Sequence, residues 1–596
     1  MSYRAPLDDM HFVLEEIAGL EALAQLPGFE DASGDLVESI LGQAGRLAAE
    51  ELAPLNHSGD REGASLQNGV VRTPKGFAEA YGHFVEGGWN GLTLPAEWGG
   101  HGLPYAVGAA TVEMWNSANI AFALCPLLTA GAIDLLHAHG SEDQKQTYLP
   151  KMANGLWSGT MNLTEPQAGS DVGALKTKAV AENGHYKISG QKIYITHGEQ
   201  DLSENIVHMV LARTAAAPAG SKGISLFIVP KFLPNPDGSL GERNDLRCIS
   251  LEEKLGIHAS PTCVMSYGDG GGAIGFLIGE ENRGMEYMFT MMNAARIEVG
   301  IQGVAIAERA LQQAVAYARN RKQSRALGAR EAAPVAILEH ADVRRNLATM
   351  RALTEAGRAL AYAVGGAIDR SRHATDADTK ALARAQEELL TPVVKSWLTD
   401  MGCQVASIGI QVHGGMGFIE ETGAAQHYRD ARILPIYEGT NGIQALDLVM
   451  RKILRDRGKG LTAVTAWLDG EVAKVTACSD APVAALAADL GAALSAVEAS
   501  GRWLLETAGE DLDRTAAGAT PFLNQLGYTV GGIFLGVSAA AVARRLSTGR
   551  GDPAFNRRKI KTAAFYCANL LPYAAAEAAR VKGGASSAQA FGPEDF

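Results

Sequence analysis

The residues Leu434–Gln444, LPIYEGTNGIQ, place one carboxylate between a tyrosine and a Gly-Thr-Asn-Gly turn, directly after an apolar run. Glu438 has no cation within three residues on either side, and its nearest charges are Arg432 and Asp430 upstream. Two interpretations are open: the side chain decorates a solvated turn, or it serves as a positioned general base.

A second loop, Met161–Asp171 (MNLTEPQAGSD), carries two hydroxyls, Thr164 and Ser170, on either side of a Pro/Gly turn. Such a loop can direct backbone N–H groups and hydroxyls at a polar or anionic ligand. The alternative is an ordinary turn.

A third loop, Gln411–Phe418 (QVHGGMGF), contains a glycine pair that lets a ligand or another backbone approach closely. His413 is a candidate base or metal ligand. No second His or Cys stands at ligand spacing beside it, so a structural or ligand-positioning role is favoured over metal binding.

Other catalytic motifs are absent. Gly270–Gly275 fits G-x-G-x-x-G, but its strand-like run follows the glycines instead of preceding them, which excludes a dinucleotide fingerprint. No G-x-S-x-G elbow, Walker loop or H-E-x-x-H occurs. A base and small-residue loops without a nucleophile suit an enzyme that takes its chemistry from a cofactor.

The composition is that of a large globular protein, with 596 residues, of which 47% are hydrophobic and 20% charged. The net charge of -13 argues against a nucleic-acid binder. The six cysteines form no C-x-x-C pair, which favours a reducing, cytoplasmic setting. The opening lacks a secretory signal, no apolar run approaches the roughly 20 residues of a membrane span, and the C-terminal GPEDF carries no targeting or lipidation signal.

Hydrophobic periodicity predicts an α+β, mostly α protein. A helical region covers 1–157, with a helix capped by Asp35 and another over 106–139, and a central antiparallel β domain follows over 158–282. A helical bundle covers 283–455 and a C-terminal helical extension covers 456–596. Because no βαβ repetition is visible, a parallel sheet is not expected.

Five motifs together resemble the acyl-CoA dehydrogenase family. LTEPQAGSD, GQKIYITHG, ARNRKQSR, QVHGGMGF and RDARILPIYEGTNGIQ stand in that family's order and approximate spacing between residues 161 and 444. The opening SYRAPLDDMHFVLEE and the long helical tail resemble a subfamily of larger members, one of which oxidises a sulfur-containing short acyl-CoA.

The resemblance implies the family fold, a helical domain, a β domain and a helical bundle, with FAD between the last two. Tyr194 stands where most members have Trp, and Ala341 stands about where a familiar Gln would fall, which leaves the adenine-side contacts open. The residues implied to bind FAD are Met161, Leu163, Thr164, Gly169, Ser170, Tyr194, Ile195, Thr196, Thr440 and Asn441, and, toward a neighbouring subunit's FAD, Arg321, Gln411, His413, Gly414 and Gly415. A homodimer or dimer-based oligomer follows from the second set.

The resemblance also answers the question of Glu438, which stands at the family's catalytic base. Its implied role is to remove the α-proton of an acyl thioester while a hydride leaves the β-carbon. The backbone N–H of Glu438 is implied to support the thioester oxygen, and Ser170, Arg296 and Gly439 are implied to contact substrate. A minority of the family places its base just before the arginine of the next helix; Ala295 stands there, and Glu298 is three positions off.

The activity implied is that of an FAD-dependent acyl-CoA dehydrogenase that passes electrons to an electron-transfer flavoprotein, with 3-(methylthio)propanoyl-CoA as the favoured substrate. The alternatives are a short/medium- or aryl-acyl-CoA dehydrogenase, an acyl-CoA oxidase, and a non-enzymatic flavin-bearing relative that binds DNA.

The tail carries a basic cluster, defined here as Arg544, Arg545, Arg550, Arg557, Arg558, Lys559 and Lys561. Alanine dominates the residues around it, which favours packing on the core over attachment to a membrane.

Overall fold

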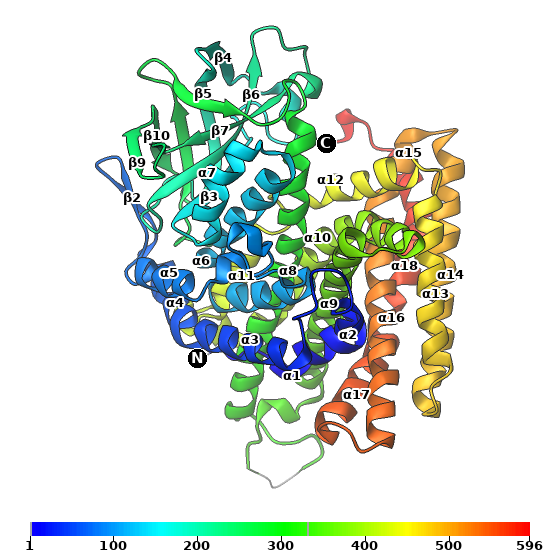
Figure 1. Ribbon diagram of the computed structural model, residues 1–596. Coiled ribbons are helices and arrows are strands. Elements are labelled where there is room, and N and C mark those ends of the chain that lie inside the picture. Colours follow the sequence, from blue (N-terminus) through cyan, green and yellow to red (C-terminus); the bar gives the residue numbers. More distant parts are fainter. Residues whose placement is uncertain (1–2, 330–332) are drawn as a thin grey trace.

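The computed structural model describes residues 3–329 and 333–596 (Figure 1). The N-terminal region is helical and carries one short hairpin, β1 (Ser65–Gln67) with β2 (Val70–Arg72). Its helices are α1 (Leu7–Val13), α2 (Leu20–Leu23), α3 (Gly34–Leu47), α4 (Ala53–Glu62), α5 (Phe77–Glu86), α6 (Tyr105–His139) and α7 (Glu142–Ala153).

The start of α3 corrects one expectation. Ser33, not Asp35, caps the helix, because the Ser33 hydroxyl accepts a hydrogen bond from the Leu36 N–H at 3.3 Å. Asp35 lies inside the first turn, where a carboxylate still interacts favourably with the helix dipole.

The central domain is an eight-stranded sheet with the order β10-β11-β5-β12-β7-β6-β3, and β4 pairs with both β5 and β6. Its strands are β3 (Trp157–Asn162), β4 (Lys178–Glu182), β5 (His185–Thr196), β6 (Asn205–Thr214), β7 (Ser225–Pro230), β10 (Leu246–Leu251), β11 (Thr262–Tyr267) and β12 (Ala273–Leu277). A separate hairpin joins β8 (Phe232–Pro234) to β9 (Leu240–Arg243).

Most pairs are antiparallel, as expected, but β3 and β4 each pair with β6 in parallel. The purely antiparallel expectation was therefore wrong. The parallel pairs arise because β5 carries the chain back across the sheet before β6 begins, so β6 runs in the direction of β3 and β4. The loop Gly270–Gly275 leads directly into strand β12 and not into a helix, in agreement with the rejected dinucleotide site.

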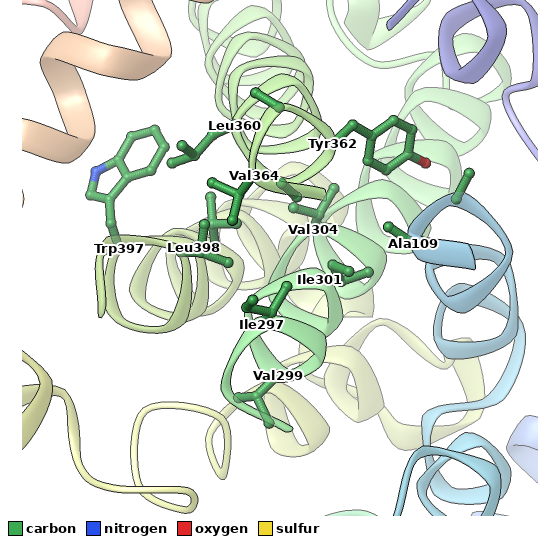
Figure 2. Close-up of a cluster of buried hydrophobic side chains, with 14 of the residues drawn as sticks. Ala109, Ile297, Val299, Ile301, Val304, Leu360, Tyr362, Val364, Trp397 and Leu398 are labelled. Atoms are coloured by element: carbon green, nitrogen blue, oxygen red, sulfur yellow. The ribbon is translucent and has the colours of Figure 1, made fainter. Parts of the chain in front are cut away.

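The bundle consists of α8 (Gly284–Asn320), α9 (Ala341–His373), α10 (Ala377–His413), α11 (Ala424–Ala431) and α12 (Asn441–Leu446). Figure 2 shows Ile301 and Val304 of α8, Leu360 of α9 and Leu398 of α10 pointing into one apolar core. Helices α8 and α10 meet through small residues. A Cβ added to Gly402 would lie 2.7 Å from the Gly303 carbonyl oxygen, so this close crossing depends on glycine.

The C-terminal extension lies beside the bundle (Figure 1), and its long helix α16 is covered on one side by α13 and α14 and contacts α9, α10 and α12 on the other. Its helices are α13 (Lys459–Thr476), α14 (Ala481–Ala508), α15 (Leu512–Ala517), α16 (Ala519–Ser547), α17 (Pro553–Asn569), α18 (Pro572–Ala579) and α19 (Ala585–Ala588).

Three helices of the described chain are long and apolar enough to cross a membrane by length and composition: Tyr105–His139, Ala481–Ala508 and Leu512–Ser547. The expectation that no apolar run approaches that length was therefore wrong. In the first and third helices, 83% and 94% of the apolar window is buried inside the protein, against 33% in the second. The apolar surface of α6 and α16 thus serves the core.

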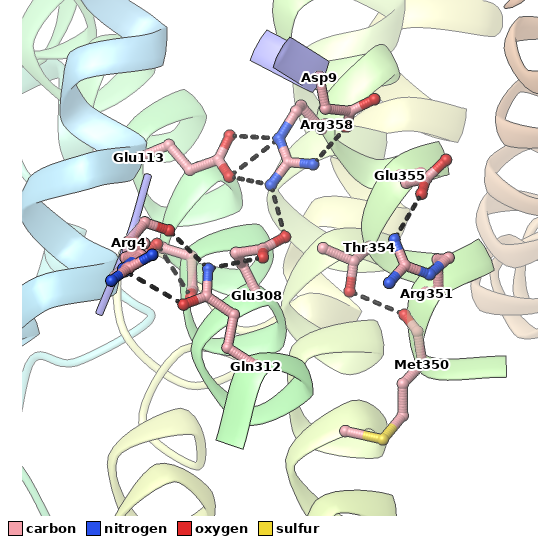
Figure 3. Close-up of polar contacts among 12 residues, drawn as sticks. Arg4, Asp9, Glu113, Glu308, Gln312, Met350, Arg351, Thr354, Glu355 and Arg358 are labelled. Carbon is pink, nitrogen blue, oxygen red and sulfur yellow. Dashed lines mark hydrogen bonds and ion pairs between the residues drawn. The ribbon is translucent and has the colours of Figure 1, made fainter. Parts of the chain in front are cut away.

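The opening segment and the tail hold each other through buried charges. Asp9 of α1 accepts hydrogen bonds from Lys559 of α17 at 2.7 Å and from Arg358 of α9 at 2.6 Å. Lys559 also contacts Glu355 at 3.0 Å, and the Arg358 guanidinium bridges to Glu113 and Glu308 (Figure 3). One buried ion network thereby joins both ends of the chain to the bundle.

Three of the seven residues of the basic cluster, Arg544, Arg545 and Lys559, pair with acidic residues. Arg545 pairs with Glu15 at 2.7 Å and with Glu16 at 2.8 Å, and Arg544 pairs with Glu16 at 3.2 Å. The tail packs on the core, which is the arrangement the sequence favoured.

Candidate active site

Glu438 lies in the turn between α11 and α12, with a backbone φ of 56° in the left-handed region. Such a conformation in a non-glycine residue costs free energy and is found most often at functional sites. The turn is held from outside, since the Gln444 side chain donates to the Glu438 carbonyl at 3.1 Å and the Asn441 N–H donates to the Pro435 carbonyl at 3.0 Å. The carboxylate is thereby presented from a fixed backbone.

Burial raises the pKa of Glu438 to about 7, against the opposing effect of the Arg296 and Lys395 cations. Carboxylate and carboxyl forms are then both populated near neutral pH. This is the condition under which a carboxyl group works best as a general base.

Arg296 of α8, the expected substrate contact, lies beside this turn. It is buried and stands 3.5 Å from Asp447, and its Nε has no hydrogen-bond partner among the described residues. A Cβ on Gly439 would lie 3.9 Å from the Arg296 guanidinium. The structure thus brings Glu438, Gly439 and Arg296 together.

Two buried features of this site escaped the sequence analysis. The Tyr437 hydroxyl donates to Gln302 of α8, whose amide donates to Asn116 of α6 at 3.1 Å. Lys395 of α10 is fully buried and acts on Glu438 electrostatically. These residues come from distant parts of the chain, and no local pattern marks them.

The expected flavin loop and the end of β5 lie side by side. The Thr164 carbonyl accepts the Ile193 N–H at 2.9 Å, and the Thr160 hydroxyl donates to the Thr196 carbonyl at 2.7 Å. Tyr194 has φ 60° and exposes 60% of its surface, while the neighbouring Ile195 is buried. The ring of Tyr194 therefore offers a flat apolar face beside the loop.

The loop itself presents groups suited to an anionic ligand. Ser170 is exposed, a Cβ on Gly169 would meet nothing within 4 Å, and Met161 is buried while Leu163 is half-buried. A buried ion pair that the sequence did not reveal anchors the loop, since Lys192 contacts Glu165 at 2.8 Å and helps lower the pKa of Glu165 to about 2.

The second set of expected cofactor residues lies at the far end of the bundle. Arg321 follows α8 about 37 Å beyond Arg296 at the usual helical rise. The rings of Tyr317 and His413 stack at 4.5 Å, which places the end of α10 beside the end of α8. Within one chain, Arg321, Gln411, His413, Gly414 and Gly415 are therefore remote from Glu438.

The surface at this far end is open. Arg321, Gln411, Gly414 and Gly415 are exposed, and a Cβ on either glycine would meet nothing within 4 Å. His413 is buried, its Nδ1 contacts the Gly409 carbonyl at 2.7 Å, and its Nε2 has no partner among the described residues. A ligand that reaches this end can use these groups.

Two expected cofactor residues have their side chains engaged by the protein. Asn441 accepts from Lys395 at 2.9 Å, and Thr440 caps α12 by accepting the Ile443 N–H at 3.4 Å. Their contact with a cofactor stays a prediction, and in this geometry their backbone groups would make it.

The structure holds a carboxyl group of near-neutral pKa at the turn before α12, and a flat aromatic face with hydroxyl-bearing loops in the β domain. These are the parts of a cofactor-dependent oxidoreductase that removes a weakly acidic proton. The exposed Tyr194 ring and the open loop at Gly169 fit a flavin and its phosphates.

Comparison with known proteins identifies the family. Successive stretches match the models for the acyl-CoA dehydrogenase N-terminal domain (37–156), middle domain (160–269) and C-terminal domain (282–454). Residues 464–591 match the model described as acetyl-CoA dehydrogenase C-terminal like. The chain belongs to the acyl-CoA dehydrogenase family, whose members bind FAD.

The chain is similar over its whole length to individual members. It is 50% identical to a 3-methylmercaptopropionyl-CoA dehydrogenase of Ruegeria pomeroyi over 98% of both chains. It is 34% identical to a broad-specificity linear acyl-CoA dehydrogenase of Mycobacterium tuberculosis over 96% of both. An acyl-CoA dehydrogenase of Bacillus anthracis complexed with FAD shares the fold, with a TM-score of 0.74, 24% identity, and coverage of 96% of this chain and 91% of that one.

Proposed function

We propose that this acyl-CoA dehydrogenase introduces a trans α,β double bond into a short acyl-CoA thioester, with 3-(methylthio)propanoyl-CoA as its preferred substrate. The observation that carries the reaction is Glu438, held on a rigid turn with a pKa of about 7. The similarity to the Ruegeria pomeroyi enzyme supports the substrate.

In this proposal, Glu438 removes the α-proton of the thioester. Held against Tyr194 and the loop Met161–Ser170, FAD would supply the acceptor for the hydride that leaves the β-carbon. The Glu438 N–H supports the charge that develops on the thioester oxygen, and Ser170 and Arg296 hold the substrate. Gly439 keeps the backbone beside the base free of a side chain.

The cofactor would lie against Tyr194, Ile195 and Thr196, with the loop Met161–Ser170 around it. The distance between Glu438 and Arg321 supports a homodimer, because Arg321 and the Gln411–Gly415 loop are too far away to serve the FAD beside their own Glu438. They would complete the site of a second copy.

An electron-transfer flavoprotein is the proposed electron acceptor and the cytoplasm the proposed location. The six free cysteines are compatible with a reducing compartment.

Anaerobic mixing with a panel of acyl-CoAs tests this function. The yellow holoenzyme is expected to bleach fastest with 3-(methylthio)propanoyl-CoA, more slowly with butanoyl-CoA and slowest with octanoyl-CoA, and mass spectrometry should find the enoyl-CoA. Equal rates across the panel would contradict the substrate proposal, and no bleaching by any acyl-CoA would contradict the reaction. Reoxidation by oxygen faster than by electron-transfer flavoprotein would instead identify an oxidase.

A further inference from the structure

Lys395, in the middle of α10, is a buried amine with no carboxylate among the described residues as a direct hydrogen-bond partner, and burial lowers its own pKa to about 7 against the opposing effect of Glu438. It is fully inaccessible, and its Nζ donates to the neutral Asn441 Oδ1 at 2.9 Å. Across residues 3–329 and 333–596, no carboxylate oxygen lies within 4.0 Å of it. A buried ammonium with one neutral partner destabilises a fold, so packing alone does not account for this residue.

Lys395 is one of the cations that act on Glu438. Arg296 of α8 and, second to it, Lys395 of α10 are the two cations that act to lower the pKa of Glu438. Arg296 is already paired with Asp447, which also binds Arg451 at 3.3 Å. Lys395 is therefore the cation beside Glu438 that no other buried carboxylate neutralises.

The remaining neighbours are weaker. Asp400 of α10 acts on Lys395, but it is exposed to solvent, where water screens its charge. Tyr437 hydrogen-bonds to Gln302 and stays neutral, because burial holds the pKa of its hydroxyl well above the usual value. Neither group supplies a positive charge, so neither can replace Lys395 as the counter-charge of Glu438.

Lys395 is also tied to the turn mechanically. Asn441 is the first residue of α12, and its amide donates to the Ser396 carbonyl at 3.1 Å and to the Thr399 hydroxyl at 3.0 Å. The Lys395 bond to the same side chain completes this attachment. The turn that carries Glu438 is thereby fastened to α10.

We infer that Lys395 is a positioning residue for the base: its ammonium favours the carboxylate form of Glu438, and its bond to Asn441 fixes the turn. This role rests on the proposed function of Glu438. Lys395 lies in none of the five sequence motifs, so the inference adds a residue in the middle of α10 to those that support the reaction.

The sign of the effect follows from the charge. A nearby cation stabilises the carboxylate, so removing the cation must raise the pKa of Glu438 above about 7. The base is then protonated, and inactive, over a wider range of acid pH. The acid limb of the pH–rate profile should move to higher pH by about one unit, which is about a tenfold loss of rate at pH 6.

The test compares Lys395→Met with Lys395→Arg, which restores a charge, and with Lys559→Met, which removes the buried lysine of the ion network far from the site. For each holoenzyme, an infrared pH titration follows the protonated carboxyl band that disappears in Glu438→Gln. The pH dependence of anaerobic flavin reduction is measured in parallel.

Both readouts should shift upward by about one pH unit in Lys395→Met, return toward wild type in Lys395→Arg and stay unchanged in Lys559→Met. Should Lys395→Met fail to fold, Lys395→Gln takes its place with the same expectation.

An unshifted carboxyl band in folded Lys395→Met, or in Lys395→Gln in its place, would overturn the inference. A lower Tm with an unchanged pH–rate profile would also overturn it, because that result identifies a purely structural residue. These outcomes leave the proposed function intact. If none of the acyl-CoAs reduced the flavin of the wild-type protein, the proposed function would be wrong. The infrared titration would still report on Lys395.

Discussion

At the scale of single residues, Glu438 has a backbone conformation and an environment that suit a general base but lower the stability of the fold. Its backbone is in the left-handed region and its carboxyl group is shielded from water, and both features cost stability. The turn is held by the hydrogen bonds of Gln444 and Asn441 and by the attachment of Asn441 to α10.

The pKa of Glu438 predicts a pH-dependent gain in stability for Glu438→Gln. The folded pKa of about 7 lies above the ordinary value of 4.5, so ionisation of Glu438 destabilises the fold as pH rises from 4.5 to 7. The variant should therefore be more stable than wild type at pH 8, by up to about 3 kcal/mol, and equally stable at pH 4.5. Denaturant unfolding of the apoprotein at the two pH values measures this, and an equal effect at both would contradict the burial argument.

Tyr194 yields a prediction about the cofactor alone. Its ring is exposed and packs on no core residue, so Tyr194→Ala should leave the Tm of the apoprotein unchanged within about one degree. Loss of an aromatic face should weaken FAD binding about tenfold, while Tyr194→Trp should keep it. Fluorescence titration of apoprotein with FAD gives both values. Equal affinity of the alanine variant would place the flavin elsewhere.

At the scale of secondary-structure elements, the sequence predicted what local pattern determines. The helix over 106–139 was placed within one residue of its observed bounds, because its periodicity spans many residues. The cap at Asp35 was wrong, because capping depends on the backbone angles of Ser33.

Contacts between distant elements were beyond prediction. The parallel pairing of β3 with β6, and the chain from Tyr437 through Gln302 to Asn116, depend on how elements pack. The base was found because its turn belongs to a family motif, whereas Lys395 stands in no motif.

The ion network of α1, α9 and α17 yields a prediction for one element. Lys559→Met removes one of the two cations that pair with each of the buried carboxylates Asp9 and Glu355, leaving Arg358 and Arg351, and breaking buried pairs in this way costs up to about 3–5 kcal/mol. Lys561→Met is the matched control, since Lys561 lies two positions further along α17 and is exposed. Chemical denaturation should show a large loss for the first variant and a change within about 0.5 kcal/mol for the second. Similar stabilities would show that the network contributes little.

At the scale of the whole molecule, the ends of the chain depend on each other. The acidic residues of the opening segment meet the basic cluster of the tail, and α16 covers the bundle helices that hold Glu438 and Lys395. The tail is an integral part of this fold.

Removal of residues 460–596 tests that dependence. The truncation uncovers the faces of α9 and α10 that contact α16, so we expect aggregated or FAD-poor protein. Size-exclusion chromatography and the flavin-to-protein ratio measure the outcome, and a monodisperse, fully flavinated truncation would contradict it.

In a liposome flotation assay the full-length protein should stay at the bottom of the gradient, because Arg544, Arg545 and Lys559 are already paired with acidic residues.

The measurement that tests the central claim most directly is the reaction of Glu438→Gln with 3-(methylthio)propanoyl-CoA under anaerobic rapid mixing, with α-proton exchange followed in D₂O. The variant should bind FAD and acyl-CoA as wild type does, because the side chain keeps its shape. Flavin reduction and α-proton exchange should both fall by ~10²–10⁴-fold or more, since the positioned base is gone. Rates within a factor of about two of wild type would show that another group removes the proton.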